Sequence, residues 1–372
     1  MQRISVANLQ PGMVTAYNVF NSDGSVLIKA DIPLTNLYVK RLKQFGLGSI
    51  YIKNPLLEGV QIPEIVKEDT KKKAIQVVQN AFKYFATFRE IDIEPFKLVA
   101  NSLADEVILN RESMIHLADT RTFDEYLYGH SVNVCLLSLL TGLLLDYNVT
   151  KLREMALGVL LHDLGQTLIP NEIVSKPGKL TPEEMNVIRQ HTEFGFEALR
   201  KVREISVPAA HVAFQHHENF DGSGYPRGLK GTDIHEYSRI TSIANMYDAL
   251  ISDRPYRKAF LPHEAYEIIM TLGTKYFDPK ILDIFLANVA IYPIGSVVKL
   301  STGDTGIVTN VFRKMQARPV VKIICDEKGQ IVANGDEIDL TQNYTIFINK
   351  LLNEEDVIAL TMNALGKSTT SL

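Results

Sequence analysis

The sequence predicts a multidomain α+β protein: a central all-α helical bundle flanked by a small N-terminal α+β module and a small C-terminal β-barrel-like module. Three observations support this prediction. From about residue 68 to 288, apolar residues recur at three- and four-residue spacing nearly throughout. The two flanking parts contain β-branched segments separated by turn residues. All nine histidines lie between positions 116 and 263, and the flanking parts contain none.

The composition is that of a soluble globular protein. A chain of 372 residues with 46% hydrophobic and 22% charged residues is expected to form two or three domains. The net charge of -4 gives no general attraction to nucleic acid polymers. The two cysteines, Cys135 and Cys325, are too far apart in sequence to suggest a disulfide framework or a Cys-x-x-Cys zinc site, so we expect a cytoplasmic protein. The opening "MQRISVANLQPGMV" lacks the features of a signal peptide.

Residues 1–62 are predicted to form the N-terminal module. The stretch "VTAYNVFNSDGSVLIKA" alternates apolar and polar residues around a turn, which predicts a hairpin. The next stretch, "LTNLYVKRLKQFGL", has helical spacing, and "SIYI" predicts a closing strand. The segment "NPLLEGVQIPEIVKEDTKKK" carries two prolines and a charged run, and is interpreted as a linker.

Residues 63–118 are predicted to form a helical linker and the start of the bundle, and residues 119–288 its main part. One helix start is well marked, because Thr181 is a favoured cap and Pro182, Glu183 and Glu184 suit the first turn. The apolar run "VNVCLLSLLTGLLL", residues 132–145, is short for a membrane span and contains polar residues. We therefore expect a buried core helix and no membrane insertion.

Residues 289–352 are predicted to form the C-terminal β module. Three segments, "IGSVVKLSTGDTGIVTNVF", "RPVVKIICDEKGQIV" and "YTIFIN", are rich in β-branched residues and separated by turns. Residues 353–372 are expected to be a tail.

Six residues in the helical block are candidate metal ligands. Each lies on, or at the end of, an apolar-periodic segment: His130, His162, Asp163, His191, His216 and His217. Neutral imidazole and carboxylate bind iron, manganese, zinc or nickel, and a carboxylate can bridge two ions. Two such ions suit phosphate ester hydrolysis, because they acidify water and neutralise charge on the phosphate. Any one of these histidines taken alone is more simply a core or surface residue, but together they indicate a metal site.

Three motifs identify a family. The segments "HDLGQ", "HHENFDGSGYPRGLKG" and "RITSIANMYDALISDRPYR" together resemble the HD-GYP family, over roughly residues 120–285. These are HD-superfamily phosphohydrolases that open the bacterial messenger cyclic di-GMP. The opening "VANLQPGMVTAYNVF" also resembles a small N-terminal module of some members. The resemblance implies an HD-type helical bundle that holds two, sometimes three, divalent transition metal ions, commonly iron or manganese.

The resemblance also implies roles for individual residues. The six candidate ligands match the family's ligands, and Asp163 would be the bridging carboxylate. Members with a third ion have a glutamate four residues before the first histidine, where this chain has Tyr126, so two ions are expected. Tyr225 would present its ring or hydroxyl to a guanine or a phosphate. Arg254 and Arg257 match basic phosphate contacts, although either could instead pair with Asp253 or Glu264 on the surface.

Two positions depart from the family pattern. Gln166 replaces a lysine that contacts the substrate phosphate, so phosphate binding should weaken. Asn245 replaces an aspartate that is the last ligand of the first metal, and an amide oxygen is a weaker, neutral donor. Asp248 lies one helical turn beyond Asn245, where it could orient a water, protonate the leaving oxygen or reach the metal itself.

The resemblance implies hydrolysis of cyclic di-GMP to linear pGpG, and further to GMP in some cases, with activity weakened by the two departures. One alternative is a degenerate domain that binds a cyclic dinucleotide or a partner and signals without turnover. A second alternative is hydrolysis of another cyclic dinucleotide or nucleotide phosphate. The sequence leaves open whether two chains pair through the amphipathic segment 70–118.

Overall fold

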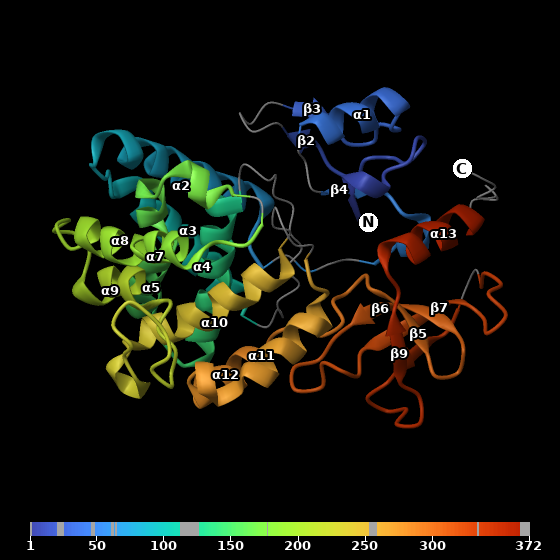
Figure 1. Cartoon of the computed structure of the whole chain (residues 1–372). Helices are drawn as coiled ribbons and strands as arrows, with labels where there is room; N and C mark the ends of the chain where they lie inside the picture. The colour runs from blue at the N-terminus through green and yellow to red at the C-terminus, as the bar shows by residue number, and fades with distance from the viewer. Residues whose placement is uncertain are drawn as a thin grey trace. The chain divides into compact units, whose positions relative to one another are not determined.

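Figure 1 shows a computed structural model of the chain. It describes residues 2–20, 26–45, 49–60, 63, 65–111, 126–176, 178–252, 259–332 and 335–364. These residues form two compact units. One contains the described residues within 64–115 and 125–289, and the other those within 1–63 and 290–372.

In the first unit, the regular secondary structure of the described residues is helical. Its α-helices are α2 (Glu68–Phe88), α3 (Glu94–Leu109), α4 (Tyr126–Leu144), α5 (Val149–Leu160), α6 (Asn171–Val174), α7 (Pro182–Arg189), α8 (His191–Leu199), α9 (Val207–Gln215), α10 (Glu236–Ile251), α11 (Pro262–Tyr276) and α12 (Pro279–Leu286). A short 3-10 helix, η4 (Leu164–Leu168), follows α5. The mostly helical fold predicted for this part of the chain is confirmed.

Local sequence sets several helix starts. Thr181 caps α7, and its hydroxyl accepts from the backbone N–H of Glu184, whose carboxylate accepts from the backbone N–H of Thr181. This reciprocal capping box confirms the start predicted from the sequence. The Asn148 side chain caps α5 and the Ser206 side chain caps α9 in the same general way.

Helix α4 lies at the centre of the helical unit, packed against α2, α5 and α10. The window Leu127–Leu144 has the length and apolar composition of a membrane span, but 78% of it is buried inside the protein. Burial on several faces by neighbouring helices explains its apolar character, as the sequence predicts for a core helix.

The second unit begins with strand β1 (Gln2–Ser5), which pairs antiparallel with β4 (Ser49–Ile52). Strand β2 (Val19–Phe20) pairs antiparallel with β3 (Val26–Ile28), and helix α1 (Asn36–Gln44) is capped by Thr35. The predicted strand pairing, helix and closing strand are thus present. The resemblance of this segment to a family module stays a prediction.

The C-terminal part of this unit is an antiparallel sheet of five strands in the order β8-β7-β6-β5-β9. The strands are β5 (Val297–Leu300), β6 (Thr305–Asn310), β7 (Val320–Cys325), β8 (Glu337–Asp339) and β9 (Ile348–Leu351). Strands β8 and β9 are the two edges and do not pair with each other, so the predicted barrel is not closed. Helix α13 (Glu354–Ala364) occupies residues expected to be a tail.

Candidate metal centre

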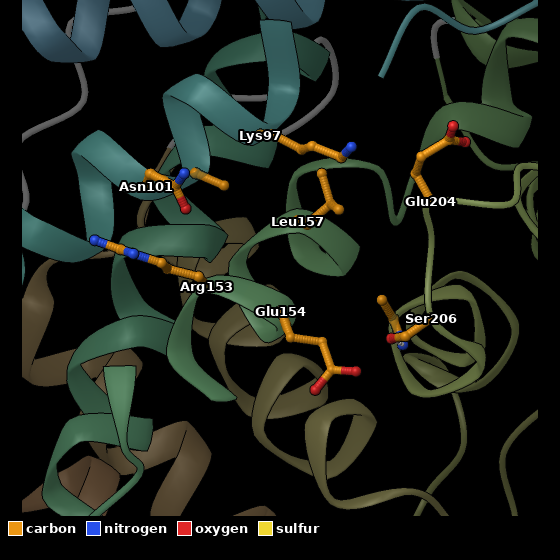
Figure 2. A pocket seen from close by; sticks show the side chains of 9 residues that line it. Lys97, Asn101, Arg153, Glu154, Leu157, Glu204 and Ser206 are labelled. Carbon is orange, nitrogen blue, oxygen red and sulfur yellow. Dashed lines mark hydrogen bonds between the residues drawn. The ribbon is translucent and has the colours of Figure 1, made fainter. Parts of the chain in front are cut away.

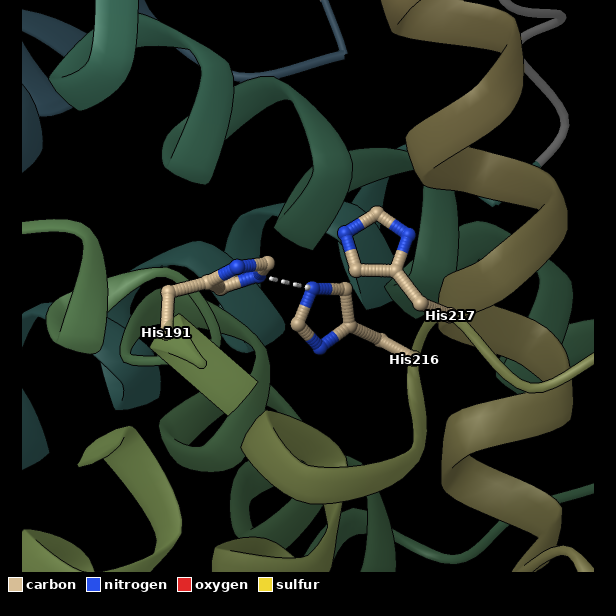
Figure 3. A group of neighbouring side chains, drawn as sticks. All are labelled: His191, His216 and His217. Carbon is tan, nitrogen blue, oxygen red and sulfur yellow. Dashed lines mark hydrogen bonds between the residues drawn. The ribbon is translucent and has the colours of Figure 1, made fainter. Parts of the chain in front are cut away.

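The fold brings the six predicted ligands together from separate elements. His130 lies on α4, and His162 and Asp163 lie in the turn between α5 and η4. His191 begins α8, His216 is the capping residue after α9, and His217 follows it. Two groups have ligand atoms within 4.8 Å of one another: His130, His162 and Asp163 form one, and His191, His216 and His217 form the other. Figure 3 shows the second group, with the His191 ring directed toward the His216 ring.

The Asp163 carboxylate lies between the two groups. Its Oδ2 atom is 3.3 Å from His162 Nε2 and 3.8 Å from His130 Nε2. Its Oδ1 atom is 3.5 Å from His191 Nε2 and 3.6 Å from His216 Nε2. A carboxylate with one oxygen directed to each group has the placement that a bridging ligand needs.

Three of the histidines are oriented by backbone carbonyls. The Nδ1 atom lies 2.8 Å from the Val159 oxygen in His162 and 2.6 Å from the Ile188 oxygen in His191. In His216 it lies 3.0 Å from the Val212 oxygen. A carbonyl accepts only, so Nδ1 carries the proton in the neutral ring and the lone pair is on Nε2.

The lone pairs meet at the centre of the site. The Nε2 atoms of His191 and His216 are 3.4 Å apart, and neither can donate to the other in this tautomer. His162 Nε2 and Asp163 Oδ1 are buried and have no hydrogen-bond partner. Buried polar atoms are rarely left unpaired, because the desolvation cost is about 1–3 kcal/mol each. Converging lone pairs and unpaired atoms are what a cation would satisfy, so these residues fit bound metal.

The electrostatics of the site favour an ionised Asp163 and neutral His216 and His217. Burial raises the pKa of Asp163, but the imidazoles, His162 first, outweigh it and hold that pKa well below its ordinary value. Burial holds the pKa values of His216 and His217 well below normal, and neighbouring imidazoles add to the effect. Burial opposes protonation of His162 too, yet Asp163 raises its pKa. A cation bound here would take the place of that proton.

Asn245 and Asp248 both contact His130 from α10. The carboxylate of Asp248 lies 2.6 Å from His130 Nδ1, and Oδ1 of Asn245 lies 2.8 Å from His130 Nε2. Asp248 is 0% exposed and also accepts from the Asn133 amide at 2.9 Å. A buried carboxylate on Nδ1 fixes the ring and makes Nε2 a better donor to metal. The geometry supports a positioning role for Asp248, and the catalytic role predicted for it stays a prediction.

The loop after His217 is held against the site by Glu218. This carboxylate is 2% exposed and accepts from the backbone N–H groups of Arg227 and Leu229, at 2.8 and 3.0 Å. The Tyr225 N–H donates to the His217 carbonyl at 3.1 Å. The Tyr225 ring stacks on the His217 imidazole, with centroids 4.7 Å apart and planes 20° apart. Tyr225 therefore lies beside a candidate ligand, and its predicted contact with a guanine or a phosphate stays a prediction.

Two glycines allow these segments to approach closely. A Cβ atom at Gly165 would lie 1.9 Å from the His191 carbonyl oxygen. A Cβ atom at Gly224 would lie 2.3 Å from the backbone nitrogen of Asn219. Any larger residue would push apart the backbone segments that carry the candidate ligands.

The remaining predicted site residues are less defined. Gln166 is half-buried on η4, and its backbone N–H donates to the Asp163 carbonyl. Arg254 and Arg257 lie outside the described residues, so their predicted phosphate contacts stay predictions.

Two residues that support the candidate ligands, Asn133 and Glu218, were not assigned roles from the sequence. Asn133 follows His130 by three residues on the same helix, which is the one local signal it offers.

A separate cavity of about 240 Å³ lies in the helical unit, lined by residues of α3, α5 and α9 and of the segment before α9 (Figure 2). No predicted site residue lines it. Some of its charged groups have partners already, since Arg153 pairs with Asp105 at 2.7 Å and Glu154 accepts from the Tyr237 hydroxyl at 2.7 Å. The candidate ligands therefore define a site distinct from this cavity.

Comparison with known proteins relates the chain to two families. Residues 112–281 match the HD domain, and residues 297–360 match a KOW domain associated with the HD domain. The chain is 35% identical over 268 residues to cyclic di-GMP phosphodiesterase PA4108 of Pseudomonas aeruginosa, covering 72% of this chain and 64% of that protein. It is 42% identical over 134 residues to a cyclic di-GMP phosphodiesterase of Thermotoga maritima, covering 36% of each.

Two further matches broaden the comparison. The chain is 40% identical over 129 residues to 3'3'-cGAMP-specific phosphodiesterase 2 of Vibrio cholerae, covering 34% of this chain and 25% of that protein. It therefore spans less than two thirds of the length of each of these relatives. Among solved structures, Bd1817, described as an HDG"Y"P protein from Bdellovibrio bacteriovorus, matches with a TM-score of 0.51 at 19% identity, covering 77% of this chain and 98% of that one. This last match shows a shared fold.

Proposed function

We propose that the chain, whose residues 112–281 match the HD domain, is an HD-GYP member of that family and hydrolyses a phosphodiester of cyclic di-GMP to give linear pGpG. The observation that carries the proposal is the convergence of imidazoles on Asp163, with its Oδ1 atom and His162 Nε2 buried and unpaired. The protein would be a metal-dependent phosphodiesterase, with GMP as a further product where hydrolysis continues.

The cofactor we propose is a pair of divalent transition metal ions, iron or manganese. The six converging residues and Asn245 would hold them, with Asp163 shared between the two ions. Such a pair, when bound, activates water and neutralises charge on a phosphate. Asp248 and Asn133 would keep the His130 ring in position, since both hydrogen bonds are buried.

The substrate would be positioned by residues around the ligands. The Tyr225 backbone N–H donates to the His217 carbonyl, and the Tyr225 ring stacks on the His217 imidazole. So placed, Tyr225 would stack on a guanine or donate its hydroxyl to a phosphate. Gln166 would donate a neutral hydrogen bond to a phosphate, and Arg254 and Arg257 would add charge. We further propose that the protein is cytoplasmic and that its partner is the small molecule cyclic di-GMP. Pairing of two chains through residues 70–118 stays a prediction.

The alternative is a binding module without turnover. Gln166 and Asn245 favour it, because each is a neutral side chain where the family pattern that the motifs resemble implies a charged one. A different cyclic dinucleotide is the other alternative, since one relative is named for 3'3'-cGAMP. These alternatives share the site and differ in what the protein does with its ligand.

Anaerobic turnover assays distinguish three possibilities: hydrolysis of cyclic di-GMP, binding without turnover, and hydrolysis of a different cyclic dinucleotide. Metal-loaded protein should convert cyclic di-GMP to pGpG faster than it converts 3'3'-cGAMP, with product identified by chromatography and mass spectrometry. Binding of cyclic di-GMP without any product would support the signalling module, and faster cleavage of 3'3'-cGAMP would change the substrate. Absence of both binding and cleavage would overturn the proposed function.

A further inference from the structure

Arg189 places a positive charge next to Tyr225. It is the last residue of α7 and precedes His191 by two positions. Its guanidinium carbon lies 5.0 Å from the centre of the Tyr225 ring. Since Tyr225 also stacks on His217, the three side chains form a connected group that reaches from solvent to the candidate ligands.

The Arg189 guanidinium has no acidic partner among the residues that the structure describes, and its side chain is exposed. Two other arginines of the helical unit form ion pairs with acidic side chains. Arg200 pairs with Glu197 at 2.7 Å, and Arg153 pairs with Asp105 at 2.7 Å. Arg189 is therefore a cation held by an aromatic ring and available to an anion.

The residues around the Arg189 guanidinium indicate which ligand its positive charge could bind. Gln166, whose backbone N–H donates to the Asp163 carbonyl, has a neutral side chain. Arg227, in the same loop as Tyr225, has its guanidinium 6.0 Å from the ring of Phe214. An anionic nucleotide that reaches Tyr225 and the candidate ligands would thus meet Arg189 at the edge of the site.

We propose that Arg189 binds a phosphate group of the nucleotide, and that Tyr225 holds its side chain ready to do so. The inference rests on the proposed function and adds a substrate-binding residue to it. A planar guanidinium can give two parallel hydrogen bonds to phosphate oxygens, which an ammonium cannot. Contact with the ring also restricts the side chain before binding, which lowers the entropy lost on binding.

The test compares full-length, metal-loaded Arg189→Gln, Arg189→Lys and wild type. We measure Kd for cyclic di-GMP and for pGpG at two salt concentrations, with kcat, KM, metal content and melting temperature. Arg189→Gln should weaken both Kd values by about tenfold and reduce their salt dependence. Metal content and melting temperature should not change, and Arg189→Lys should restore part of the affinity. Arg200→Gln, which removes an exposed arginine just after the next helix, should behave as wild type.

Each outcome bears on the inference. Unchanged Kd values in Arg189→Gln overturn it, as does a loss of affinity that is accompanied by loss of metal or of folding. If wild type binds cyclic di-GMP without cleaving it, the proposed hydrolysis fails while the Kd comparison still decides the role of Arg189. If wild type binds neither nucleotide, both proposals fail together.

Discussion

Replacing His162 and Asp163 together by alanine is expected to lower kcat/KM for cyclic di-GMP by at least about a thousandfold. Asp163 lies between the two histidine groups, so its loss removes the one carboxylate that both groups share. A metal ion contributes several kcal/mol of charge stabilisation, and each 1.36 kcal/mol is about tenfold in rate. The measurement is anaerobic turnover with matched protein concentrations.

The double variant should remain folded. Both side chains are buried, His162 Nε2 and Asp163 Oδ1 have no hydrogen-bond partner to lose, and the hydrogen bond that is lost joins His162 Nδ1 to the nearby Val159 oxygen. Thermal melting and the metal content are measured on the same samples. His211→Ala is the matched control, because His211 lies on α9 and its Nδ1 atom bonds within that helix to the Val207 oxygen, while its ring contacts Phe196. Full activity in the double variant would show that the site is not the place of hydrolysis.

Asn245→Asp is expected to raise metal affinity by about tenfold or more and to raise hydrolysis with it. The Asn245 oxygen is 2.8 Å from His130 Nε2, the nitrogen that would bind metal. An aspartate there offers a charged oxygen in place of a neutral one, and a hard or borderline cation binds the charged oxygen more strongly. The measurement is retention of metal during dialysis, followed by turnover of the retained fraction.

In metal-free protein, Asn245→Asp should lower the stability of the folded state. It adds negative charge around His130, which already lies near Asp163 and Asp248. Like charges at short distance destabilise the folded state until a cation is bound. The metal-free variant should therefore melt below wild type, and the metal-loaded variant above it. Asn245→Ala is the control for loss of the amide, and should bind metal less well than wild type. If Asn245→Asp leaves metal retention unchanged, residue 245 is not a ligand.

The candidate ligands were predictable because each histidine lies on, or at one end of, a segment that the apolar pattern marks as helical. The residues that support them were not. Asp248 is 118 positions from His130, and Asn133 is 115 positions from Asp248, so their hydrogen bonds depend on how α4 and α10 pack. The role of Glu218 depends on the path of the loop that returns to it, which no local pattern specifies.

Prediction of the fold from the sequence also failed where the structure depends on contacts between distant segments. Strands β5, β6 and β7 follow from β-branched segments between turns, but closure depends on how the edge strands pair, and β9 begins four residues after the start of "YTIFIN". Helix α13 was missed because its stability comes from packing. Ile358 is buried with the core of the first strands, and Val357 with that of the C-terminal sheet. A short helix without such contacts is marginal in water.

The metal content of protein purified without oxygen tests the central claim most directly. The grouping of five candidate histidines around the Asp163 carboxylate predicts about two transition metal ions per chain, one of them lost more readily on dialysis, and little metal in the His162→Ala, Asp163→Ala variant. Wild-type protein that carries no metal, and takes up none when iron or manganese is supplied, would contradict the account.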